Sequence, residues 1–121
     1  METNFRIAED RDADLLLDFM RDFYAIDHYP FDETISRQTL LALIKDKSLG
    51  RVWVIESEDK PVGYLALVFG YSLEYKGRDA FIDELYIQAE HRNLGIGGKA
   101  MQFVAQACAK LGVKAISLPT C

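Results

Sequence analysis

Hydrophobic and polar positions follow two different periods along the chain, and the change between them falls at Gly50. Before Gly50, apolar residues between positions 13 and 24 recur at the three- and four-residue spacing of a helix with one buried stripe. Pro30 ends this helix, and a second helix begins at Asp32 or Thr34. The first part of the chain is therefore predicted to be mainly helical.

Beyond Gly50 the pattern is that of β-strands separated by polar turns at residues 57–61 and 76–79. The predicted elements are, in order, a strand at 5–9, the two helices, strands at 51–56, 62–69 and 81–87, a helix from about 97 to 111, and a strand at 113–118. This order, β-α-α-β-β-β-α-β, predicts an α/β protein with a mixed sheet. An antiparallel meander leads into a right-handed, parallel β-α-β unit.

The composition is that of a single globular domain spanning residues 1–121, with 50% hydrophobic and 27% charged residues. Met1 opens onto a polar segment and the longest apolar run, 65–69, is short, so we expect no signal peptide, no membrane contact and a cytoplasmic location. A net charge of −5 argues against nucleic acid as a partner and favours a cationic substrate. Cys108 and Cys121 lack metal-ligand spacing, so neither a metal site nor a disulfide is predicted.

The stretch at residues 91–100, "HRNLGIGGKA", places three glycines in four positions directly before a predicted helix. Glycine is costly at a helix start unless the bare backbone is needed there. A glycine-rich turn at a helix N-terminus presents unpaired N–H groups and the positive end of the helix dipole. The stretch therefore predicts an anion site suited to phosphate or pyrophosphate.

Two well-known phosphate patterns do not fit this stretch. The Walker A pattern fails because Asn93 stands where its first glycine is needed and Ala100 where serine or threonine is needed. The dinucleotide pattern G-x-G-x-x-A matches Gly95, Gly97 and Ala100. However, residues 88–94 separate its first glycine from the strand, and no acidic residue follows the next strand.

A third pattern, R/Q-x-x-G-x-G/A, is met by Arg92, Gly95 and Gly97, which follow the strand "FIDELYIQAE". The chain resembles the GNAT superfamily of acyl-CoA-dependent N-acyltransferases in this motif, in the amphipathic helix after it and in the order of its elements. The resemblance is strongest over residues 80–118. The resemblance implies acetyl-CoA as cosubstrate and transfer of its acetyl group to a primary amine. Main-chain N–H groups would cradle the coenzyme pyrophosphate, here those of Asn93, Leu94, Gly95, Ile96, Gly97 and Gly98. Arg92 either reaches a phosphate with its side chain or holds the loop.

The same resemblance gives a role to the strand that precedes the loop. In the family this strand is splayed from its parallel neighbour, often by a bulge, which leaves backbone groups unpaired. Those groups bind the pantetheine arm and polarise the thioester carbonyl. In this chain the corresponding residues are Leu85, Tyr86 and Ile87.

Asp83 and Glu84 are the two candidate catalytic acids. Several members of the family carry a glutamate, proposed as the base, nine residues before the motif arginine, and Asp83 holds that place relative to Arg92. A base is needed because a protonated amine must lose a proton before it attacks. Strand alternation turns Glu84 to the other face of the sheet unless a bulge reverses it. The alternative is that both acids only satisfy polar groups at the strand edge.

Recognition of the acceptor is expected in the loop at residues 24–33, whose aromatic and acidic side chains suit an amine cation. Tyr71, Glu74 and Tyr75 form a second cluster of this kind. The acceptor would be a small polyamine, an aminoglycoside-like amine or a lysine-like amine. The alternative is a solvated loop with a few aromatic side chains in the core, and His28 alone is not evidence of a base.

Members of the family usually continue past the last strand into a further helix and two strands, which do not follow here before Cys121. The domain is therefore expected to be truncated at its C-terminus. The alternative function is a non-catalytic acyl-CoA-binding or assembly module. If no strand follows it, the strand at 113–118 is an unprotected edge, which predicts a homodimer or a larger oligomer for either function.

Overall fold

The computed structural model describes residues 2–118. Its elements are, in chain order, β1 (Thr3–Ile7), a 3₁₀ turn (Asp10–Asp12), α1 (Ala13–Ile26), α2 (Glu33–Lys45), β2 (Gly50–Ser57), β3 (Lys60–Ser72), β4 (Gly77–Ile87), a 3₁₀ turn (Ala89–His91), α3 (Ile96–Lys110) and β5 (Ala115–Ser117). The predicted order of strands and helices is confirmed. Of the two predicted starts of the second helix, Asp32 is the cap, because its carboxylate accepts a hydrogen bond from the Ile35 N–H at 3.0 Å.

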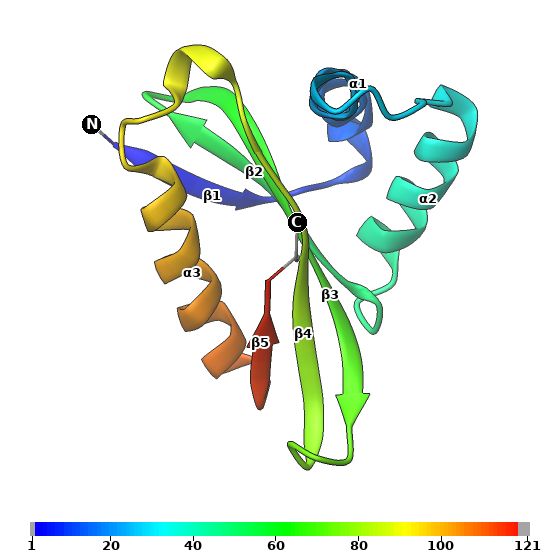
Figure 1. Ribbon diagram of the computed structural model, residues 1–121, viewed down its shortest axis with the longest axis vertical. Helices are drawn as coiled ribbons and strands as arrows, with labels where there is room; N and C mark the ends of the chain where they lie inside the picture. Colours follow the sequence, from blue (N-terminus) through cyan, green and yellow to red (C-terminus); the bar gives the residue numbers. More distant parts are fainter. Residues whose placement is uncertain (1, 119–121) are drawn as a thin grey trace.

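The strands form one mixed sheet in the order β1-β2-β3-β4-β5. Strands β1 to β4 pair antiparallel, and α3 connects β4 to the parallel strand β5, as predicted (Figure 1). The described pairing of β4 with β5 involves only residues 79–81 of β4. Beyond Phe81, no strand among the described residues pairs with that edge of β4. The parallel strands therefore part well before β4 ends.

The β3–β4 hairpin is longer than predicted. We expected a polar turn at residues 76–79, but β3 runs to Ser72 and β4 begins at Gly77, so that residues 73–76 form the turn. The ladder continues through polar residues because its hydrogen bonds come from the backbone, as in the pair of Tyr71 with Arg78. The hairpin consequently projects beyond the rest of the sheet (Figure 1).

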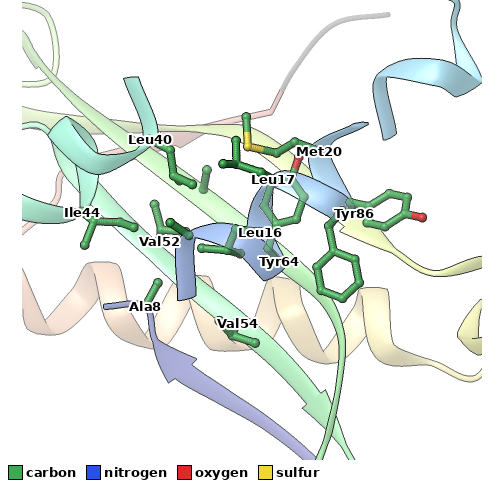
Figure 2. Packing of buried hydrophobic residues seen from close by; sticks show 13 residues of the cluster. Ala8, Leu16, Leu17, Met20, Leu40, Ile44, Val52, Val54, Tyr64 and Tyr86 are labelled. Atoms are coloured by element: carbon green, nitrogen blue, oxygen red, sulfur yellow. The ribbon is translucent and has the colours of Figure 1, made fainter. Parts of the chain in front are cut away.

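Helices cover both faces of the sheet, α1 and α2 on one face and α3 on the other (Figure 1). Along β2, Val52 and Val54 face α1 and α2, whereas Trp53 and Ile55 face α3. This two-sided burial explains the unbroken hydrophobic runs of the central strands. Figure 2 shows the core on the side of α1 and α2, with Leu16 of α1 against the central strands.

Asp12 is buried where the 3₁₀ turn meets α1. Its carboxylate accepts hydrogen bonds from both terminal nitrogens of Arg6, at 3.0 and 3.1 Å, and from the Glu9 N–H at 2.8 Å. Burial raises the pKa of Asp12, but the Arg6 and Glu9 donors outweigh it, so the pKa lies below its usual value. The bidentate ion pair between Arg6 and Asp12 connects β1 to the start of α1.

Asp12→Asn should lower the free energy of unfolding at neutral pH by about 2 kcal/mol, because the Arg6 guanidinium loses its bidentate charged partner and keeps only Glu56, at 3.3 Å. An acid with a lowered pKa stabilises the fold above its unfolded pKa and loses this effect as the pH falls through the folded pKa. In urea unfolding, the wild type should therefore lose more stability than the variant between about pH 5 and pH 2. Equal losses in the two proteins would contradict this role of Asp12.

The remaining expectations concern membrane-spanning helices, the two cysteines and the last strand. Among residues 2–118, no helix is long and apolar enough to cross a membrane. Cys108 is a buried free thiol, and Cys121 lies outside the described residues. Strand β5 is shorter than the predicted strand and pairs only with β4 among the described strands. The homodimer expected at this edge stays a prediction.

Candidate functional site

A bulge in β4 decides how its two acidic residues lie. Ala66 of β3 is opposite Glu84, and the next residue of β3, Leu67, is opposite Ile82. Asp83 is therefore an extra residue, and the alternation of side chains reverses across it. The exception allowed for a bulge therefore applies: Glu84 does not face the other side of the sheet, since Asp83 and Glu84 line the same cavity.

Glu84 is half-buried and accepts hydrogen bonds from two tyrosines. The Tyr24 hydroxyl donates to Oε2 at 2.6 Å and the Tyr64 hydroxyl to Oε1 at 2.7 Å. Burial raises the pKa of Glu84, the two phenols oppose this rise, and the charge of Asp83 adds to it, so the pKa lies above its usual value. Burial and the Glu84 carboxylate also raise the pKa of both tyrosines, so the phenols keep their protons and act as donors.

A cavity of about 340 Å³ opens beside the two carboxylates. The side chains that line it are aromatic or acidic apart from one proline: Phe23, Tyr24, Asp27, Tyr29, Pro30, Asp83 and Glu84. The first half of the expected acceptor loop thus meets the acids of β4. None of the lining residues is basic. Across the described part of the chain, no group of three or more His, Cys, Asp or Glu side chains could hold a metal ion.

Helix α3 begins at a glycine-rich turn and has no side-chain cap. Gly95, its N-cap residue, has a φ of +82°, a left-handed conformation that favours glycine. No side chain caps the helix and its first turn holds no acid, whereas α1 and α2 carry Asp14 and Glu33 there. The N–H groups of residues 96–98 have no acceptor within the helix. The start of α3 therefore has the polarity of an anion site.

Neither packing nor backbone conformation explains why Gly97 and Gly98 are glycines. Apart from its chain neighbours and the backbone of its own helix, a Cβ at either position would meet no atom within 4 Å, and neither residue has a positive φ. By contrast, a Cβ at Gly63 would lie 1.9 Å from the carbonyl oxygen of Tyr86, so that glycine is required by the sheet. Glycines in the first turn of α3 weaken the helix relative to alanine. The space beside these two positions is open to a ligand.

Arg92 fastens the loop to the end of β4. Its Nε donates to the carbonyl oxygen of Ile87 at 2.7 Å, and its guanidinium lies over the Tyr86 ring, 5.7 Å from the centroid. Of the two roles expected for Arg92, the contact that holds the loop is present, and the phosphate contact stays a prediction. Ile96 is buried and anchors the other end of the loop, whereas Leu94 is exposed.

The backbone of β4 has an open edge close to this loop. The Gln88 N–H donates to the Val62 carbonyl oxygen at 2.8 Å. Because hydrogen bonding alternates along an antiparallel ladder, Tyr86 also bonds to β3, and Leu85 and Ile87 direct their backbone groups away from β3. The expected backbone role of this strand thus falls mainly on Leu85 and on the N–H of Ile87, whose carbonyl oxygen accepts from Arg92, and it stays a prediction.

Not every residue of the expected acceptor site is near this cavity. Tyr71 and Tyr75 are 78% and 54% exposed on the β3–β4 hairpin, and neither they nor Glu74 line it. His28 belongs to the loop but does not line the cavity either. Tyr64 was not foreseen, and its one signal in the sequence is a tyrosine within the aliphatic run of β3.

The sequence is similar to an acetyltransferase family and to a curated protein. The model of the acetyltransferase (GNAT) family matches residues 13–121. A thialysine N-epsilon-acetyltransferase of Bos taurus is 35% identical over 57 residues, which cover 47% of this chain and 33% of that protein. The match thus spans about a third of the length of this curated relative.

Solved structures share the whole arrangement. An integron cassette protein from the mobile metagenome of Cole Harbour Salt Marsh superposes with a TM-score of 0.92 at 33% identity, over 96% of this chain and 76% of that one. A predicted acetyltransferase from Clostridium acetobutylicum, solved with acetyl-CoA, superposes with a TM-score of 0.82 at 17% identity, over 98% of this chain and 81% of that one. The second likeness concerns the fold alone.

Proposed function

The chain belongs to the GNAT acetyltransferase family, and on this premise we propose that it transfers the acetyl group of acetyl-CoA to a primary amine. The observation that carries the proposal is the pairing of two features along β4. One is the open, acid-free start of α3, and the other is the cavity lined by Asp83 and Glu84. The first suits a diphosphate, and the second suits an amine and its proton.

The segment at residues 85–98 would hold the coenzyme. Backbone N–H groups at the start of α3 would bind the pyrophosphate, in space that a Cβ at Gly97 or Gly98 would fill. Leu85 and Ile87 would orient the pantetheine arm from the open edge of β4. When bound, acetyl-CoA supplies an acetyl group activated as a thioester.

The cavity favours a cationic acceptor. Asp27, Asp83 and Glu84 supply negative charge, and the rings of Phe23 and Tyr29 offer cation–π contact. Because no lining residue is basic, a carboxylate on the acceptor would meet only negative charge. We therefore favour polyamines, aminoglycoside-like amines and lysine side chains with a blocked carboxylate. This differs from the free amino acid in the name of the bovine relative.

A comparison of lysine with lysine amide should test the charge argument, because the two compounds differ only in the carboxylate. We expect kcat/KM to be about tenfold higher for the amide, which corresponds to a relief of about 1.4 kcal/mol of repulsion. Release of the coenzyme thiol is the measurement, with putrescine and an aminoglycoside as further acceptors. Equal values for lysine and its amide would contradict the proposed acceptor class.

Thermal unfolding with acetyl-CoA separates the proposed function from the alternative. A ligand that binds only the folded state raises the melting temperature. A rise together with thiol release supports acetyl transfer. A rise without release for any amine in the panel would indicate a non-catalytic acyl-CoA-binding module. No rise with either acetyl-CoA or coenzyme A would contradict both functions.

A further inference from the structure

Two phenols share one carboxylate at the centre of the proposed site. Tyr24 comes from α1 and Tyr64 from β3, and they lie 60 and 20 residues from Glu84 along the chain. Each phenol donates to a different oxygen, so the carboxylate cannot rotate without losing both hydrogen bonds. The direction of Glu84 relative to the cavity is thus fixed.

The two tyrosines hold Glu84 from different surroundings. Tyr64 is 2% exposed and packs against the rings of Phe19 and Phe23, at centroid distances of 6.5 and 6.4 Å. Tyr24 lines the cavity of about 340 Å³, which Tyr64 does not reach, and both tyrosines line a smaller cavity of about 90 Å³ beneath α1 and α2. Tyr64 is therefore a donor fixed in the core, and Tyr24 is a donor at the cavity wall.

We propose that Tyr24 and Tyr64 are positioning residues that keep Glu84 ionised and aimed at the cavity, where it accepts a proton from the acceptor amine. This inference rests on the proposed function. A half-buried carboxylate favours its protonated form, which cannot accept a second proton, and hydrogen bonds to the charged form oppose this. The titratable groups around Glu84 are the two tyrosines, Asp83 and, across the cavity, Asp27. None of them is basic, so no ion pair replaces the phenols.

The proton transfer balances without any further reactant. An ammonium acceptor gives one N–H proton to an oxygen of Glu84 and keeps the electron pair of that bond, so it becomes a neutral amine. Glu84 becomes a carboxylic acid and later releases the proton to water. Each carboxylate oxygen has a second lone pair, so the proton can be received while both phenols stay bound. Asp83, exposed in the same cavity, attracts the ammonium ion.

Titration of the Glu84 carboxyl by ¹³C NMR tests the inference without acetyl-CoA. The loss of its signal in Glu84→Gln assigns it. Tyr24→Phe and Tyr64→Phe should each raise the titration midpoint by about one pH unit, because each removes a hydrogen bond to the charged form. Tyr75→Phe, on the exposed hairpin, is the matched control and should leave the midpoint unchanged.

Tyr24→Phe, the variant at the cavity wall, is sufficient to test the proposal even if the Tyr64→Phe protein does not fold. An unchanged midpoint in folded Tyr24→Phe would overturn the proposal. In kinetics, the acidic limb of the kcat/KM profile should move up in Tyr24→Phe by the same amount as the NMR midpoint. A rate lowered equally at every pH would mean that Tyr24 only supports the fold, and would also overturn it. A wild type without transfer activity would contradict the proposed function, and the NMR midpoints would still decide whether the tyrosines keep Glu84 ionised.

Discussion

Valine in place of Gly97 should weaken coenzyme A binding by about 10- to 100-fold and leave the fold intact. Its side chain would stand over the N–H groups at the start of α3, where the diphosphate is expected. Apart from its chain neighbours and the backbone of its own helix, no atom of the described chain lies within 4 Å of a Cβ at this position, so the new side chain would collide with the ligand and not with the protein. Calorimetric titration with coenzyme A measures the change.

Gly97→Ala tests the same site more sharply, because we expect it to raise stability and to lower the affinity for coenzyme A. Without ligand, the free energy of unfolding should rise by about 0.4–1 kcal/mol, since alanine costs less backbone entropy than glycine in a helix. The affinity for coenzyme A should nevertheless fall. Gln102→Val, at an exposed position later in α3, is the control for a β-branched residue in this helix. If both Gly97 variants bind coenzyme A as the wild type does, the glycines serve only the turn.

Glu84→Gln should reduce kcat by about 10²- to 10⁴-fold, the usual contribution of a general base, with little change in coenzyme affinity. Glutamine has nearly the same shape as glutamate and its amide oxygen still accepts a hydrogen bond from one phenol. It cannot take a proton from the acceptor. The acidic limb of the pH profile, which reports the ionisation of this residue, should disappear with it.

Asp83→Asn is the matched comparison, since Asp83 lines the same cavity but is exposed and makes no hydrogen bond to Tyr24 or Tyr64. We expect it mainly to raise KM for a cationic amine, because it removes a charge that attracts the ammonium ion. Steady-state kinetics at saturating acetyl-CoA separate the two variants. If Asp83→Asn removes the acidic limb and Glu84→Gln keeps it, then Asp83 is the base.

The order of elements could be predicted because most apolar positions of this chain follow one period at a time. In α3 the apolar residues Ala100, Val104 and Cys108 recur every four residues, and all three are buried against the sheet. The glycine-rich loop was equally visible, since its signal lies in consecutive residues and glycine is costly at a helix start. Local patterns of this kind need no knowledge of distant partners.

The sequence could give the face of Glu84 only conditionally, because a bulge is a property of two strands. The sequence around Asp83 is equally compatible with a regular strand. Only the pairing of Glu84 with Ala66 and of Ile82 with Leu67 shows that one residue is extra. Tyr64 was missed for a similar reason, since its partner is 20 residues away. Conversely, Tyr71 resembled a binding residue by type alone, and the hairpin carries it away from the cavity.

Because of the bulge, Asp83 is an inserted residue, and the alternation of side chains along β4 would be regular without it. Ile82 before it and Leu85 after it face α3, and Glu84 and Tyr86 face α1, as they would in an uninterrupted strand that lacked Asp83. The side chain at this one position therefore projects from the sheet without a place in either hydrophobic layer. Natural or engineered change here can alter the charge and reach of the acceptor site while the packing of both layers stays as it is. A new acceptor preference could thus arise at this residue at little expense to stability.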